Sequence, residues 1–357
     1  MKTDRRYFLG GLLASGLVPK PTWADAGGPA FLAAAAKPDG SFGLCGITDG
    51  FDIAFEIPLP SRGHAAAAHP TRPEAVAFAR RPGTYALVID CVTGNPKARL
   101  SSPEGRHFYG HGVFSQDGNW LFTTENDYEV GRGLIGIWDV PNSYKRAGEF
   151  SSGGIGPHDI KRLPDTDTLV VANGGIDTHP ESGRAKLNIP TMQPNLSYIT
   201  AGKITESMSL SSKMHKNSIR HLAVSENGDV AFGMQWQGEA EVTSLVGLHR
   251  MGAEAILFEA PQQQVRAMNG YIGSIAFAKD AKTIAVTSPR GGLIQTYNTL
   301  SHTIVASSAI TDVCGVAPHD RGYAITSGTG QIGNLIGRHQ NLKKSAAYQW
   351  DNHLILI

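Results

Sequence analysis

The chain has 357 residues, 41% of them hydrophobic, and a formal net charge of +1. This length can bury a large core, and the near-neutral charge gives no electrostatic argument for binding nucleic acid or an anionic membrane surface. After the N-terminal segment there is no run of about 18 apolar residues, so no transmembrane span is expected there. Glycine and proline are abundant (42 and 20 residues), as in chains of many short strands separated by turns.

The N-terminal segment is typical of an export signal. Arg5 and Arg6 precede an apolar stretch, and the segment ends in an A-x-A cleavage site from Ala24 to Ala26. We therefore predict a twin-arginine signal peptide over residues 1–26, cleaved after Ala26, and a periplasmic location. An uncleaved membrane anchor is the alternative. Because this route exports folded proteins, a cofactor inserted before export is compatible with it.

A repeated unit organises the rest of the chain. Segments that begin at His64, His111, His158 and His221 each contain a short apolar strand, a polar turn and a second strand. Further strands follow in each unit, and the spacing from His64 to His111 and from His111 to His158 is 47 residues. The same phase continues without histidine at two later positions and returns at the chain end: Ser274, Gly315 and His353.

Units of about 38 to 63 residues with four strands each predict a β-propeller. We expect an all-β fold of seven blades, in which N-terminal and C-terminal strands together complete the last blade. The N-terminal strands "AFLAAAA", "FGLCGIT" and "FDIAFEIPLP" would join the C-terminal "WDNHLILI". A single domain then spans residues 27–357, with a polar, proline-rich insertion loop over residues 176–193.

The recurring histidines are the candidate metal ligands. The first strand of each propeller blade lines the central channel, and its start is expected on the same face as the loops between second and third strands. We therefore predict that one channel mouth is lined from five consecutive blades by His64, His111, His158, His221 and His353. Neutral imidazoles suit iron, copper or zinc, and three or four of them could bind one ion.

Polar side chains on the loops of that face are candidate ligand contacts. The carboxylates could complete a metal site or orient an imidazole, and the cations could contact an anion. The predicted ligand-binding residues are Arg80, Arg81, Glu125, Asp127, Arg184, Lys186, Gln235 and Arg290.

A structural role for His111 is the alternative. In WD-type propellers a Gly-His pair before the first strand hydrogen-bonds a hydroxyl and an aspartate near a tryptophan. This blade offers such a set in Thr123 or Thr124, Asp127 and Trp138. The blade of His64 has no equivalent hydroxyl or carboxylate, so the group as a whole favours a functional channel mouth.

The cysteines suggest no metal or redox motif. Cys45, Cys91 and Cys314 are isolated in apolar, strand-like runs, and no C-x-x-C occurs. We predict that all three are buried as small hydrophobic residues.

Several longer motifs carry a resemblance to a known family. "FARRPG", "GHGVFSQDGNWLFTTEND", "GRGLIGIWDV", "GIGPHDI", "GRAKLNIPTMQPNLSYI" and the terminal "WDNHL" accompany the twin-arginine start. Together they resemble a family of exported bacterial propeller proteins of unknown function, encoded in iron-uptake loci beside imelysin-type and di-haem peroxidase-like proteins. The resemblance implies a role near iron handling and imelysin-type partners, and assigns no catalytic residue.

Three functions remain open from the sequence. The first is a non-catalytic, monomeric periplasmic protein that binds iron, another metal or a metal chelate for an iron-uptake system. The second is a metal-dependent hydrolase, lyase or oxidase at the same mouth, since no nucleophile motif is present but a metal-bound hydroxide would need none. The third is a scaffold for a periplasmic partner, with purely structural histidines.

Overall fold

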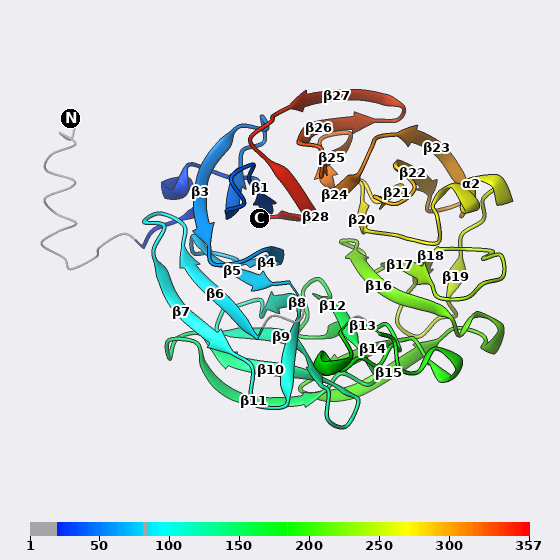
Figure 1. Cartoon of the computed structure of the whole chain (residues 1–357), viewed down its shortest axis with the longest axis horizontal. Coiled ribbons are helices and arrows are strands. Elements are labelled where there is room, and N and C mark those ends of the chain that lie inside the picture. The colour runs from blue at the N-terminus through cyan, green and yellow to red at the C-terminus, as the bar shows by residue number, and fades with distance from the viewer. Residues whose placement is uncertain (1–19, 81–83, 184) are drawn as a thin grey trace, which may run out of the picture.

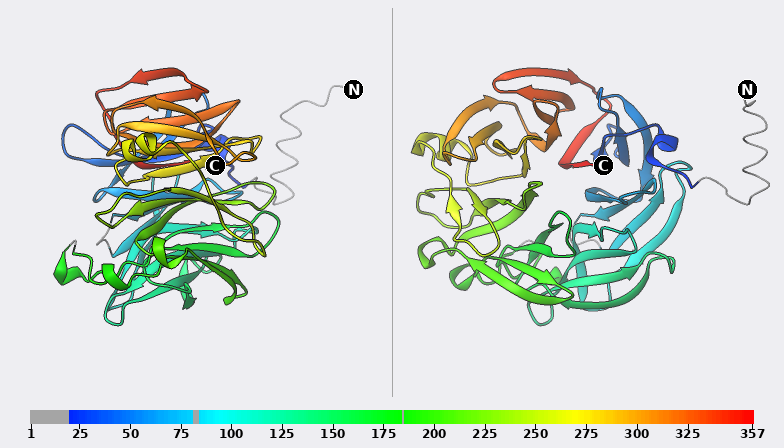
Figure 2. Two further views of the ribbon diagram at one scale, coloured as in Figure 1. Left: turned by 90° about the vertical axis from the view of Figure 1, so that its right-hand side faces the viewer. Right: turned by 180° about the vertical axis from the view of Figure 1, so that it is seen from behind.

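Seven four-stranded antiparallel sheets form a ring in the computed structural model, which describes residues 20–80, 84–183 and 185–357 (Figure 1). The chain is therefore an all-β, seven-bladed propeller, as predicted. We number the blades in chain order, and the strands within each run from the axis outward. Figure 2 shows the ring from the side and from behind.

Six blades are formed by consecutive strands. Blade 1 contains β4 (Gly63–Ala68), β5 (Glu74–Ala79), β6 (Tyr85–Asp90) and β7 (Pro96–Ser101). Blade 2 contains β8 (Arg106–Phe114), β9 (Trp120–Asp127), β10 (Arg132–Asp139) and β11 (Lys145–Ser151). Blade 3 contains β12 (Pro157–Arg162), β13 (Leu169–Asn173), β14 (Asn195–Thr200) and β15 (Lys203–Ser209). Blade 4 contains β16 (Asn217–Val224), β17 (Val230–Trp236), β18 (Val246–His249) and β19 (Ile256–Leu257). Blade 5 contains β20 (Ser274–Phe277), β21 (Thr283–Ser288), β22 (Leu293–Asn298) and β23 (Ile304–Ala309). Blade 6 contains β24 (Val313–His319), β25 (Gly322–Ser327), β26 (Gln331–Ile336) and β27 (His339–Lys344).

Blade 7 joins the two ends of the chain. Its sheet order is β28-β1-β2-β3, with the C-terminal strand nearest the axis. The strands are β28 (Gln349–Leu356), β1 (Phe31–Ala36), β2 (Phe42–Ile47) and β3 (Ile53–Leu59). The predicted closure is therefore confirmed, and Figure 1 shows β28 (red) beside β1 (blue).

Helix is confined to short pieces of the described chain: η1 (Trp23–Ala26), η2 (Pro180–Ser182), η3 (Ile189–Thr191), η4 (Ser212–Met214) and α2 (Gln262–Ala267). Two of them, η2 and η3, lie in the insertion between β13 and β14. No helix in the described ranges is long and apolar enough to cross a membrane.

Apolar side chains between neighbouring blades form the core. Between blades 1 and 2, Val76 and Phe78 pack against Phe108, Leu121 and Trp138, all of which are buried. Because both faces of each sheet are covered by adjacent blades, the middle strands have continuous apolar runs rather than a simple alternation. Wedge-shaped packing of this kind fixes the first strands around the axis.

A register shift interrupts each first strand that carries an in-phase histidine. The shift lies between Phe108 and Gly112 in β8, and comparable shifts occur in β4, β12, β16 and β28. A β-bulge breaks the regular alternation and re-aims the side chain at that point. The five bulges therefore turn the histidines toward the axis.

The predicted signal peptide lies mostly outside the described residues. Within its described part, the Trp23 indole donates a hydrogen bond to the His69 carbonyl oxygen at 3.0 Å. Ala26 is buried in the cluster that joins blades 7 and 1. Cleavage after Ala26 would remove both contacts from the propeller.

The three cysteines are free and buried. Burial raises the pKa of Cys45 and of Cys91 to about 12. Their prediction as small buried residues is confirmed.

Candidate metal centre

Five buried histidines meet on the propeller axis. They come from the first strands of five consecutive blades, from blade 7 to blade 4, and neighbouring ring centres lie 4.6–6.4 Å apart. Each side chain is less than 10% exposed. We call this group the histidine cluster: His64, His111, His158, His221 and His353.

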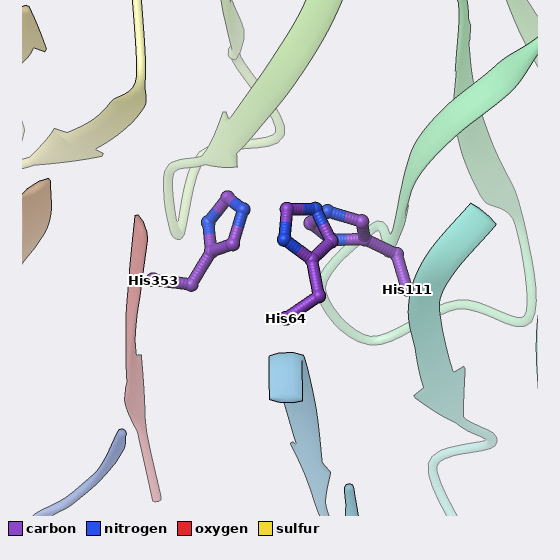
Figure 3. A group of neighbouring side chains, drawn as sticks. All are labelled: His64, His111 and His353. Carbon is purple, nitrogen blue, oxygen red and sulfur yellow. The ribbon is translucent and has the colours of Figure 1, made fainter. Parts of the chain in front are cut away.

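The cluster contains two overlapping groups that could hold an ion. In the first, His64, His111 and His353 each offer one nitrogen, and these nitrogens lie within 4.8 Å of one another. Figure 3 shows these three rings side by side. The second group, His111, His158 and His221, meets the same limit. Because His111 belongs to both, the arrangement suits one ion held by three or four imidazoles.

Two rings are oriented as metal-binding histidines usually are. The Nδ1 atom of His111 lies 3.1 Å from Oδ1 of Asp159, and Nδ1 of His158 donates to the carbonyl oxygen of Arg220 at 3.0 Å. A carboxylate or carbonyl partner on one ring nitrogen fixes the tautomer and leaves the lone pair on the other. The Nε2 atom of His111 is buried with no hydrogen-bond partner. Nε2 of His111 therefore has a lone pair available to coordinate a metal ion.

Asp159 is the buried carboxylate beside the cluster. Its Oδ1 also lies 3.3 Å from Nζ of Lys161, and its Oδ2 accepts a hydrogen bond from the backbone N–H of Leu222 at 2.9 Å. Burial alone would raise the pKa of Asp159, but the charge of Lys161 and the hydrogen bond with His111 outweigh it and lower the pKa. The carboxylate is therefore ionised, and it links blade 3 to blades 2 and 4.

Burial keeps most of the cluster neutral. Removal from water lowers the pKa of His64, His158 and His353 well below the usual range, and repulsion from neighbouring positive groups adds to this. Burial also lowers the pKa of His221 to about 3, although Asp159 opposes the shift. A neutral imidazole retains the lone pair that a metal ion needs.

A cavity of about 770 Å³ leads to the cluster from one face. It is lined by the C-terminal parts of six first strands and by the whole of β20, and its inner end contains Asp159, His221, Ser274 and His353. We call it the channel cavity. It extends toward the ends of the first strands, so it reaches the histidines from the face opposite to the expected mouth at the strand starts.

The segment between β13 and β14, which contains the insertion, contacts the starts of several first strands. Its first residues lie across blades 2 to 4: the carbonyl oxygen of Gly174 accepts a hydrogen bond from the Ser218 hydroxyl, and that of Thr178 accepts one from the Asn126 side chain. The N–H of Gly174 also donates to the carbonyl oxygen of Gly156, two residues before His158. These contacts fix the segment beside the starts of β12 and β16 and the end of β9.

The predicted loop carboxylates form ion pairs away from the cavity. Glu125 is fully buried within blade 2, where both its oxygens accept hydrogen bonds from Arg146 at 2.8 and 2.9 Å. Asp127 lies 2.9 Å from Arg132. Neither carboxylate is among the residues that line the channel cavity.

The other described candidates also have partners outside the cavity. Arg80 lies 3.4 Å from the buried carboxylate of Asp351, and the Gln235 side chain donates to a backbone carbonyl at 3.0 Å. Lys186 donates to Gln237, and the Arg290 guanidinium lies 4.3 Å from the ring centre of Tyr271. Arg81 and Arg184 lie outside the described residues.

The structural set proposed for His111 forms without it. Trp138 donates to the Thr123 hydroxyl at 2.9 Å, and this hydroxyl donates to Glu125 at 3.0 Å. The side chain of His111 faces Asp159 instead. The alternative that assigned His111 to a WD-type hydrogen-bond set is therefore wrong in its partners.

Sequence analysis missed Asp159 and Lys161. Both follow His158 in "GPHDIKR", in a strand that lines the channel. A carboxylate and a lysine within an inner strand were the available signal, because such groups are buried only where they are paired.

Fold and site define a class: a seven-bladed β-propeller whose channel encloses a histidine cluster. The chain belongs to the family described as "Protein of unknown function (DUF1513)", which matches residues 57–357. No match was found among curated proteins. Among solved structures, hydrazine synthase of Kuenenia stuttgartiensis is similar with a TM-score of 0.60 and 13% identity, covering 87% of this chain and 95% of that one. At this identity the likeness shows the fold alone.

Proposed function

We propose that this protein binds one transition-metal ion in the histidine cluster and acts as a non-catalytic periplasmic accessory protein. The observation that carries the proposal is the presence of two three-imidazole groups, each with ligand atoms within 4.8 Å, sharing His111. Without a metal, ring nitrogens of His64, His111, His221 and His353 stay buried and unpaired, at a free-energy cost. A metal ion would use those lone pairs.

The donor set favours iron(II), copper or zinc. All five candidate ligands are imidazoles, and this donor suits borderline ions rather than calcium or magnesium, which prefer oxygen. His111 and His158 are the ligands with the best support, because Asp159 and the Arg220 carbonyl orient them. The bound ion would hold together blades that are distant in sequence.

Metal analysis of the purified protein tests this function. We expect about one ion per chain after anaerobic purification or reconstitution. His111→Asn and His158→Asn should lose it, whereas His339→Asn, a change at an exposed histidine on β27, should not. Sub-stoichiometric iron, copper and zinc in the wild-type protein after reconstitution would rule the proposal out.

The role in iron uptake and the imelysin-type partner rest on the family resemblance. We propose iron as the physiological ion on that ground. A strain lacking the gene should then grow poorly when iron is scarce, and His111→Asn should fail to complement it. Normal growth of the deletion strain at limiting iron would contradict a role in iron uptake, whether or not the protein binds a metal.

A metal-dependent enzyme is the second candidate. It is favoured by the channel cavity, which reaches His221 and His353 and is large enough for a small substrate. A turnover screen of the metal-loaded protein should then find an activity that His158→Asn abolishes. Activity that survives this change would place the chemistry elsewhere.

A further inference from the structure

Polar groups gather at the end of the channel cavity that meets the histidine cluster. Apolar side chains form most of the wall, including Ala67, Ala276 and Ala317. The polar side chains at the inner end are those of Asp159, His221, Ser274 and His353. An apolar wall with a few convergent polar groups is the usual form of a small-molecule site.

His221 supplies an unused hydrogen-bond donor at this end. Its side chain is 2% exposed, and both ring nitrogens are buried without a hydrogen-bond partner. A neutral imidazole has one N–H and one lone pair. It can therefore bind a metal through the lone pair and still donate its N–H to a ligand in the cavity.

Lys161 supplies a positive charge beside it. The Lys161 ammonium lies 3.3 Å from Asp159. Lys161 lines the cavity, and about a third of its side chain is exposed. Asp159 already has three other partners: His111 and the backbone N–H groups of Ile160 and Leu222. The three ammonium donors of Lys161 can thus serve Asp159 and a ligand together.

We propose that the channel cavity binds a small amphiphilic carboxylate. Its charged end lies between the Lys161 ammonium and the His221 ring, and its apolar body lies against the alanine-rich wall. Lys161, Arg162 and Lys279 against Asp159 and Glu226 give the cavity lining a net charge of +1, which a monoanion neutralises and a phosphate dianion would overcompensate. This site goes beyond the proposed function, because it requires no metal in the histidine cluster.

Binding of straight-chain carboxylates to the full-length, metal-free protein tests the site. Calorimetry with acetate, butyrate and hexanoate should give an affinity that rises about fourfold for each added methylene, as expected for burial against an apolar wall. Hexan-1-ol and hexylammonium, which have the same body without the negative charge, should bind at least tenfold more weakly than hexanoate.

Lys161→Gln should weaken hexanoate binding about tenfold and leave hexan-1-ol binding unchanged. Lys161→Arg should restore hexanoate binding, and Lys145→Gln, an exposed change on the outer strand β11, should have no effect. Melting curves of each variant will show that it is folded. Equal binding of hexanoate and hexan-1-ol, unchanged hexanoate binding by Lys161→Gln, or no hexanoate binding at millimolar concentration would overturn the proposal.

The two proposals fail separately. A protein that takes up no metal but binds hexanoate through Lys161 retains the carboxylate site and loses the metal function. A protein that binds metal through His111 but no carboxylate gives the opposite result.

Discussion

The Nδ1 atom of His111 lies 3.1 Å from Oδ1 of Asp159, and both side chains are almost fully buried. The two residues come from different blades, β8 and β12. The carboxylate fixes the orientation of the ring and leaves Nε2 directed into the histidine cluster. This pair is the best argument that the cluster is built to bind rather than only to pack.

Asp159→Asn should weaken metal binding by about 10- to 100-fold, because an amide does not reproduce the charge that orients and polarises His111. Competition with a chromophoric chelator measures the affinity. Asp167→Asn, in an exposed turn of the same blade, is the matched control. Equal affinities of the two variants would show that Asp159 has no part in the site.

Gly110→Ala should disturb His64. Gly110 has a φ of +98°, and an added Cβ would lie 2.5 Å from Cδ2 of His64. Gly228→Ala is the control: its φ is +80°, but nothing lies within 4 Å of the added atom. Backbone strain alone should cost each variant about 1–2 kcal/mol of unfolding free energy. Urea titrations should show a larger loss for Gly110→Ala, with weaker metal binding in that variant alone.

Arg146→Met should destabilise the fold by about 3–5 kcal/mol, because it leaves the buried carboxylate of Glu125 without its ion-pair partner. Metal stoichiometry of the folded variant should stay unchanged, since Glu125 lies within blade 2 and away from the channel cavity. Denaturant unfolding and metal analysis of one preparation check both points. A loss of metal from the folded variant would show that Glu125 contributes to the metal site after all.

The metal-free protein should lose stability as the pH falls below about 6.5. The pKa values of His64, His158 and His353 are lowered by burial in the folded state, so the unfolded chain binds protons that the folded chain does not. Unfolding free energy therefore decreases with falling pH, and His221 extends this window down to about pH 3. Glu149 has its pKa lowered to about 2, chiefly by Arg106, and adds a loss of stability only below about pH 4.5.

Thermal melting between pH 8 and pH 5 measures the histidine contribution, since the carboxylates change little there. His64→Asn should flatten the curve, and His339→Asn, at an exposed position on β27, should not. A melting temperature independent of pH across this range would contradict the neutral state of the cluster.

Much of the architecture could be predicted because the chain is a repeat, and the spacing of equivalent residues gives the length and start of each unit. The spacing of 47 residues from His64 to His111 and to His158 gave the blade period, and the position of His353 gave the closure by both termini. The convergence of the five histidines followed from that phase. It required no knowledge of side-chain packing.

The accessible side of the cluster could not be predicted in this way. His111 lies five residues after the start of β8 (Arg106), and a bulge re-aims it. Strand length and bulges depend on packing between blades, so a repeat alignment does not reveal them. Glu125 was assigned to a loop, but it shares a strand face with Thr123 in β9 and points toward Trp138 and Arg146. Had the predicted strand been extended through Glu125, the alternation of side chains along it would have placed Glu125 on the face of Thr123.

X-ray absorption of the metal-loaded protein tests the central claim most directly. We predict at least three nitrogen neighbours at about 2.0–2.1 Å with the outer-shell scattering of imidazole rings. His111→Asn and His158→Asn should each remove that signature, and His339→Asn should keep it. A first shell of oxygen atoms alone, or an imidazole signature that persists in both cluster variants, would contradict metal binding by the histidine cluster.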